Sequence, residues 1–345
     1  HDVIRNIARS WLPNHLTEWQ APLKGWVPLV RFVYRRKNEM LAEIRFKSCA
    51  IHSTTLSRNS LQYNYYRRIV MFFKPKTEYE DMLYSRIRDY SGDIKVKKQI
   101  GKFWDTYKNI APKGFFKEIQ RKNCFHSRWW EMFCGVGLIS IGFEVRTSKV
   151  EKGPDFELSK NDNRYIVEAI APGEGCSADK LPAFECDYEV RSFDLPEKEF
   201  LLRLTSAITE KLNKYKIYLE KGIVSNQDAL IIALSSCNLH QYGSLMDYPV
   251  LAPLKVLRGF GFECINLKTG RRAIAKRERI SKNSGEMVDV NLFAREDMRI
   301  ISALLYSNVD PLNSPDQPEK TFVLIKNTNA LNPINDINFD GIRIL

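Results

Sequence analysis

The chain carries one segment, Ala229 to Leu234, in which every side chain is aliphatic. The run has the length of a strand and is far short of the roughly 20 residues that a helix needs to cross a bilayer. A strand that is apolar on both faces lies in the middle of a sheet that is covered on each side. The neighbouring segments alternate between helical and extended patterns, so the order helix, hairpin, helix, central strand predicts an α/β fold.

The flanking elements follow from residue spacing and from turn residues. Apolar residues at helical spacing predict helices over 78–108, from Ser127 to Gly142 and from Pro196 to Lys221. Short β-branched or aromatic runs predict strands before the central strand at 143–147, 155–158 and 165–170, and after it at 262–266, 300–306 and 321–326. Pro112 and Gly114 suggest a boundary near residue 115, so residues 116–345 are interpreted as one domain.

The net charge of +12 is concentrated in the first part of the chain. Residues 1–150 contain 28 Lys and Arg against 13 Asp and Glu, whereas residues 151–345 contain 25 against 28. A field of one sign favours a polyanionic partner, most often nucleic acid, although a basic protein that is merely soluble gives the same count. We therefore interpret residues 1–115 as a basic region that contacts nucleic acid.

Cations and aromatic residues alternate within this basic region. Arg67 and Arg68, for example, follow Tyr65 and Tyr66. Aromatic rings can stack on bases while arginines contact phosphates, so Arg67 and Arg68 are candidate nucleic-acid-binding residues. The same rings could equally be core residues of short strands.

A second group of cations interrupts the acidic remainder of the chain: Lys268, Arg271, Arg272, Lys276, Arg277, Arg279 and Lys282. With Gly270 at a turn, residues 271–280 read as a hairpin arm. Arg271 and Arg272 would then lie along a phosphate backbone. A charged hairpin that is simply solvated is the competing interpretation.

The seven cysteines are scattered, no CxxC pair occurs, and the five histidines are equally dispersed. Disulfide scaffolds and zinc sites need dense or closely spaced ligands, so neither is expected. We expect reduced thiols and a cytoplasmic protein. Without a basic amphipathic helix or a lipidation motif, no membrane partner is expected either.

Three carboxylates occupy positions where ordinary packing would place an apolar side chain. On the helix from Ser127, Glu131 shares its face with Cys134, Gly135 and Leu138. Glu168 lies between Ile166 and Ile170 on one face of its strand. A buried carboxylate is unfavourable unless a cation or a hydrogen-bond donor compensates it.

The third carboxylate, Asp155, follows Gly153-Pro154 and begins the strand that precedes a polar turn. Glu168 lies near the end of the returning strand, so the two carboxylates should meet at one end of the hairpin. Oxygen ligands of this kind suit Mg²⁺, or Mn²⁺ in its place, which neutralises a scissile phosphate and supplies a nucleophilic water. The alternative is a set of buried salt bridges, such as one between Glu168 and Lys211.

The sequence Gly153-Pro154-Asp155-Phe156 followed by Ile166-Val167-Glu168-Ala169, with Glu131 upstream, resembles the PD-(D/E)xK nuclease superfamily. This resemblance implies a restriction-endonuclease-like core, with a mixed central sheet flanked by helices and a divalent metal on Asp155 and Glu168. It covers residues 116–240 best and extends toward the C-terminus.

The sequence departs from that family at one position. The family places a lysine two residues after the glutamate, where this chain has Ile170. Some members are similar in supplying the lysine from the following helix. Lys211 lies on the buried stripe of that helix and is the candidate, while Arg203 and Ser206 lie near the same face and could contact phosphate.

The sequence therefore predicts a Mg²⁺-dependent endonuclease, with DNA favoured over RNA as substrate and Glu131, Asp155, Glu168 and Lys211 as catalytic residues. A homodimer would supply the two active sites that cutting both strands of a duplex often needs. The alternative is a catalytically inactive module of the same fold that binds nucleic acid or has a structural role.

Overall fold

The computed structural model describes residues 29–35, 39–45, 72–73, 80–148, 153–182, 195–239 and 251–345. The chain divides into two compact units, residues 1–59 and 60–345. In the first unit, β1 (Leu29–Arg35) pairs antiparallel with β2 (Glu39–Arg45). Arg67 and Arg68, predicted to contact nucleic acid, lie outside the described residues.

The second unit is built on a seven-stranded mixed sheet with the order β13-β12-β11-β6-β5-β4-β3. Its strands are β3 (Glu144–Arg146), β4 (Phe156–Lys160), β5 (Asn163–Ile170), β6 (Ala229–Ser235), β11 (Ile301–Ser307), β12 (Val323–Lys326) and β13 (Arg343–Ile344). Strands β5, β6 and β11 run parallel to one another, whereas β3, β4 and β5 pair antiparallel, as do β11 and β12. The prediction of an α/β fold with a mixed central sheet is confirmed.

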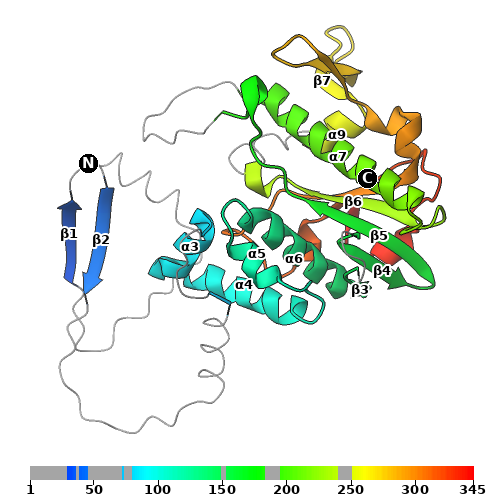
Figure 1. Ribbon diagram of the computed structural model, residues 1–345. Coiled ribbons are helices and arrows are strands. Elements are labelled where there is room, and N and C mark those ends of the chain that lie inside the picture. The colour runs from blue at the N-terminus through cyan, green and yellow to red at the C-terminus, as the bar shows by residue number, and fades with distance from the viewer. Residues whose placement is uncertain are drawn as a thin grey trace. The chain divides into compact units, whose positions relative to one another are not determined.

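The apolar run of β6 lies at the centre of the sheet and is buried along its whole length. Its side chains alternate between two hydrophobic cores: Ile231 belongs to one, and its neighbours Leu230 and Ile232 belong to the other. Figure 1 shows the helices that cover each core, with α4, α5 and α6 on one face of the sheet and α7 and α9 on the other. Helices on both faces explain why positions 229–234 of β6 are all apolar.

The helices are α3 (Met82–Asp89), α4 (Ile94–Tyr107), α5 (Phe115–Gln120), α6 (Phe125–Ser140), α7 (Glu197–Glu220) and α9 (Ala252–Leu257). The single helix expected over 78–108 is two helices, because the backbone is extended at Tyr90 and a short 3-10 turn follows. Phe103 of α4 packs edge-on against Phe133 of α6, so residues before 115 contribute to the same core as residues after it.

Helix α6 begins at Phe125, two residues before Ser127, the expected cap residue. Ser127 lies inside the first turn, where its hydroxyl donates to the carbonyl of Cys124. The C-terminal ends of α6 and α7 lie close to the predicted ends. Gly142 and Gly222 follow these two helices in the left-handed conformation that glycine tolerates. Short 3-10 turns occur at Ser91–Asp93, Ser177–Asp179, Cys237–Leu239, Leu292–Ala294, Glu296–Ile300, Pro318–Thr321 and Asp336–Phe339.

Among the described residues of the second unit, two hairpins stand outside the central sheet. Strand β7 (Phe260–Ile265) pairs with β8 (Arg272–Lys276), and β9 (Arg279–Ser281) pairs with β10 (Met287–Asp289). The strand predicted at 262–266 is therefore present, but it belongs to the first hairpin and not to the sheet. Within the described part of the chain, no helix is long and apolar enough to cross a membrane.

Candidate active site

The β4–β5 hairpin brings Asp155 and Glu168 together. Its two-residue turn, Asn161 and Asp162, has positive φ at both positions, which suits the right-handed twist of the flanking strands. Phe156 pairs with Val167, so Asp155 lies one step further along, opposite Glu168 and on the same face. The carboxylate of Asp155 accepts a hydrogen bond of 2.8 Å from the backbone N–H of Ala169, which fixes it at the end of the hairpin.

Glu168 is fully buried beneath α7 and is held there by three side chains of that helix. Its Oε2 accepts from Lys211 Nζ at 2.7 Å and from Lys214 Nζ at 2.8 Å. Its Oε1 accepts from the hydroxyl of Tyr218 at 2.7 Å. The three donors follow one another at helical spacing, so a single face of α7 neutralises this carboxylate.

Lys211 forms ion pairs with both Asp155 and Glu168. Its ammonium lies 2.7 Å from Glu168 and 3.9 Å from Asp155 Oδ2, and its side chain is only 9% exposed. Burial opposes the charge on Lys211, but the negative charges of Glu168 and Asp155 outweigh it and raise its pKa. The expected approach of Lys211 to Glu168 is therefore present, and the ammonium stays charged.

Tyr215 explains why α7 presents this face to the sheet. Its hydroxyl lies 2.6 Å from the carbonyl of Ile231 and 3.0 Å from that of Ile166, so it can donate to either strand. Its ring is fully buried. This anchor sits one turn beyond Lys211 and fixes the register of the helix on strands β5 and β6.

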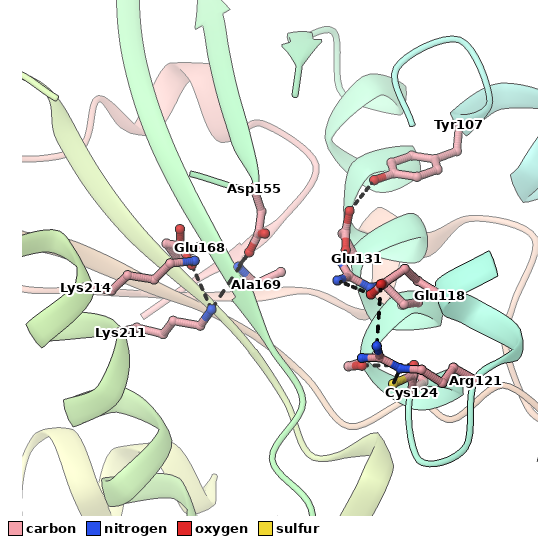
Figure 2. A network of polar contacts seen from close by, with 12 residues as sticks. Tyr107, Glu118, Arg121, Cys124, Glu131, Asp155, Glu168, Ala169, Lys211 and Lys214 are labelled. Carbon is pink, nitrogen blue, oxygen red and sulfur yellow. Dashed lines mark hydrogen bonds and ion pairs between the residues drawn. The ribbon is translucent and has the colours of Figure 1, made fainter. Parts of the chain in front are cut away.

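Glu131 lies on the other side of the sheet, on α6, and has its own partners. It accepts from the hydroxyl of Tyr107 at 2.8 Å and pairs with Arg128, which also contacts Glu118 at 2.9 Å. Gly135 makes room for this arrangement, since a Cβ there would lie 2.8 Å from the Tyr107 ring. Figure 2 shows Asp155 between this cluster and the Glu168 cluster.

The pKa of Asp155 is affected by charged groups of both clusters. Its pKa is raised to about 7, first by loss of hydration, then by the negative charges of Glu168 and Glu131, against the opposing effect of Lys211 and Lys214. A cation placed beside Asp155 would relieve this crowding of negative charge. Only one oxygen, Oδ2, has a hydrogen-bond partner among the described residues.

A pocket of about 540 Å³ opens beside Asp155. Three carboxylates and three cations line its wall: Glu118, Glu131 and Asp155, and Lys113, Lys117 and Arg128. Lys113 and Lys117 are cations of the kind that bind a phosphate group, and Asp155 is a carboxylate of the kind that binds a divalent metal, so the pocket wall offers both.

The other predicted site residues lie apart from this cluster. Arg203 donates to the carbonyl of Gly173 at 2.8 Å, in the segment after β5, and Ser206 is exposed on α7. Arg271 and Arg272 are exposed on the β7–β8 hairpin.

Sequence reasoning missed Lys214, Tyr218, Tyr107 and Arg128. For Lys214 and Tyr218 a signal existed, because they continue the face of Lys211 at three and seven residues.

Within the described ranges, no group of three or more His, Cys, Asp or Glu side chains is arranged to hold a metal ion. Two carboxylates from adjacent strands still fit Mg²⁺, because this ion is commonly held by one or two carboxylates with water and substrate phosphate completing its shell. Comparison of the chain with protein-family models, with curated proteins and with solved structures finds no match.

Proposed function

We propose that this protein is a metal-dependent nuclease that hydrolyses phosphodiester bonds of nucleic acid, with DNA favoured over RNA. The observation that carries the proposal is the convergence of Asp155, Glu168 and Lys211 at one end of the β4–β5 hairpin. Two carboxylates with a buried ammonium match the pattern of the PD-(D/E)xK nucleases, with the lysine supplied by the following helix.

Asp155 and Glu168 are the residues that would hold the metal. Among the described residues, one carboxylate oxygen of Asp155 has no hydrogen-bond partner, and Glu168 Oε1 accepts from Tyr218 alone. A bound divalent ion supplies an activated water and neutralises charge on the scissile phosphate.

Lys211 and the pocket beside Asp155 perform the remaining tasks. The ammonium of Lys211 faces both carboxylates, where it can orient a water or stabilise the negative charge on the phosphoryl oxygens. Lys113, Lys117 and Arg128 on the pocket wall bind the phosphates on either side. Glu131 keeps Arg128 in place on that wall.

A second function, a catalytically inactive nucleic-acid-binding module, is favoured by one observation. Glu168 is already neutralised by Lys211 and Lys214, so it does not require a metal to be stable in the interior. In that case the cluster is a buried ion pair that fixes α7 on the sheet. The two functions differ in their dependence on metal.

The test is cleavage of labelled DNA and RNA in Mg²⁺, Mn²⁺ or chelator. We expect cleavage with either metal, none in chelator, and loss of cleavage without loss of binding in Asp155→Asn. Asp162→Asn, at the opposite end of the same hairpin and in a turn conformation that asparagine accepts, is the matched control and should cut like the parent. Cleavage that persists in chelator or in Asp155→Asn would overturn the proposal.

A further inference from the structure

The β7–β8 hairpin exposes apolar side chains that packing within the described residues does not cover. Leu267, at the tip, is 96% exposed, and Phe262, Ile265 and Ile274 along the strands are between 40% and 69% exposed. Single exposed apolar residues are common, but four on one two-stranded ribbon are more typical of an interaction surface.

The tip of this hairpin is preformed. The side-chain Oδ1 of Asn266 accepts from the N–H groups of Lys268 at 3.0 Å and of Thr269 at 3.1 Å. Gly270 closes the turn with a hydrogen bond of 2.8 Å to the Asn266 carbonyl and a φ of 66°, which glycine adopts without strain. Leu267 is thus held outward by the turn, and little conformational freedom is left to lose on binding.

The base of the hairpin is fixed to the body of the protein. Arg277 donates to Glu197 in the first turn of α7 at 2.9 Å, and Lys276 donates to the carbonyl of Arg258 at 3.1 Å. Figure 1 shows the hairpin extending away from α7 and α9. Because its base is fixed and its tip is preformed, we call the β7–β8 hairpin, residues 260–277, the arm.

The charge of the arm identifies the chemistry of its partner. Residues 260–277 contain five Lys and Arg and a single acidic residue, Glu263. Lys268, Arg271 and Arg272, all exposed, gather at the tip beside Leu267. Cations around an apolar tip complement a nucleic acid, in which phosphates lie outside and bases lie inside.

We propose that the β7–β8 hairpin is an arm that enters a groove of double-stranded DNA. Lys268, Arg271 and Arg272 contact phosphates, and Leu267 contacts the base edges. The inference rests on the proposed function for nucleic acid as the substrate and names the class of substrate, duplex DNA. The major groove of B-form DNA, about 12 Å wide, admits a two-stranded ribbon, whereas the major groove of A-form RNA is too narrow for one. Apolar side chains in a groove meet thymine methyl groups or base steps.

The experiment measures binding of a labelled DNA duplex, and of the RNA duplex of the same sequence, by fluorescence anisotropy in chelator over a range of salt. Lys268→Ala/Arg271→Ala/Arg272→Ala should flatten the slope of log affinity against log salt by about 2 to 3, because each phosphate contact contributes about 0.9. Leu267→Asn should lower affinity roughly 10-fold at every salt concentration with the slope unchanged, because it removes an uncharged contact.

Matched controls separate the arm from general charge and surface polarity. Lys221→Ala/Lys320→Ala/Arg343→Ala removes the same charge from other exposed positions, and Ile337→Asn changes a residue that is 74% exposed elsewhere. Both controls should bind DNA like the parent.

Equal losses in arm and control variants would overturn the inference, as would equal losses on duplex RNA. It would also be overturned if the arm variants altered only self-association or binding to anionic vesicles. Because chelator prevents metal-dependent cleavage, a protein that binds DNA through the arm but never cuts it contradicts the nuclease proposal alone. Metal-dependent cleavage with unchanged DNA binding in the arm variants contradicts the arm alone.

Discussion

Glu168 and Glu131 are both buried carboxylates, on opposite faces of the central sheet, yet their partners differ in kind. The cation beside Glu131 is Arg128, one turn earlier on the same helix, so the pair forms wherever α6 forms. The cations beside Glu168 come from α7, 43 and 46 residues away, so they arrive only when that helix docks on the sheet. Lys211 reaches both Glu168 and Asp155, whereas Arg128 is shared between Glu131 and Glu118. In the nuclease that we propose, the Glu168 face would carry the chemistry and the Glu131 face would position the substrate.

The largest effect on stability is expected at Glu168. Glu168→Ala leaves two ammonium groups without their buried counter-charge, which typically costs about 3–5 kcal/mol. Glu131→Ala should cost less, because Arg128 keeps Glu118 and its side chain is 32% exposed to water. Denaturant unfolding of the two variants measures the difference. Equal losses in the free energy of unfolding would mean that Glu168 does not depend on its buried ion pairs more than Glu131 does.

Lys211 and Lys214 allow the comparison to be made within one cluster. Both contact Glu168 Oε2, but only Lys211 also lies near Asp155, and Lys214 is 35% exposed. Lys211→Met should slow cleavage roughly 10²- to 10³-fold, the usual effect of removing one group that stabilises a transition state. Lys214→Met is the control and should slow cleavage much less. If a folded Lys211→Met variant cuts like the parent, the cluster is a structural ion pair.

Much of this arrangement could be predicted from the sequence because it depends on local patterns. The aliphatic run of β6 predicted a strand covered on both faces, and the strand periodicity placed Glu168 on one face with Ile166 and Ile170, the face that α7 covers. The buried stripe of α7 then pointed to Lys211 as the inward cation. Each of these steps uses only residue spacing within one element.

The remainder depends on contacts between elements, which spacing within one element does not specify. Tyr107 reaches Glu131 from another helix, and the only local sign of it is the small residue Gly135 on the receiving face. The strand Phe260–Ile265 has an ordinary extended pattern, so its sequence could not tell a place in the sheet from a place in a separate hairpin. The break between α3 and α4 likewise depends on the backbone at Tyr90, inside an otherwise helical pattern.

The two smallest expected effects concern the charge on Asp155, which lies between the two clusters. Its pKa in the folded protein, about 7, lies above its ordinary value near 3.8, because burial, then Glu168, then Glu131 disfavour its charged form. The folded chain therefore retains a proton that the unfolded chain releases. This contribution to the free energy of unfolding is complete below about pH 4 and is lost as the pH rises through about 7. Asp155→Asn should remove that decline in chelator.

Glu131→Gln tests whether the two faces are electrically connected through Asp155. Removing the Glu131 charge should lower the pKa of Asp155 and make the decline in stability between pH 4 and 7 shallower than in the parent. The change should be modest, since burial and Glu168 contribute more to the shift than Glu131 does. Denaturant unfolding at several pH values in chelator measures it, with Glu220→Gln on the exposed end of α7 as the control. A pH profile identical to that of the parent would show that Asp155 senses the Glu168 cluster alone, and the Glu131 face would then have no part in setting the charge of Asp155.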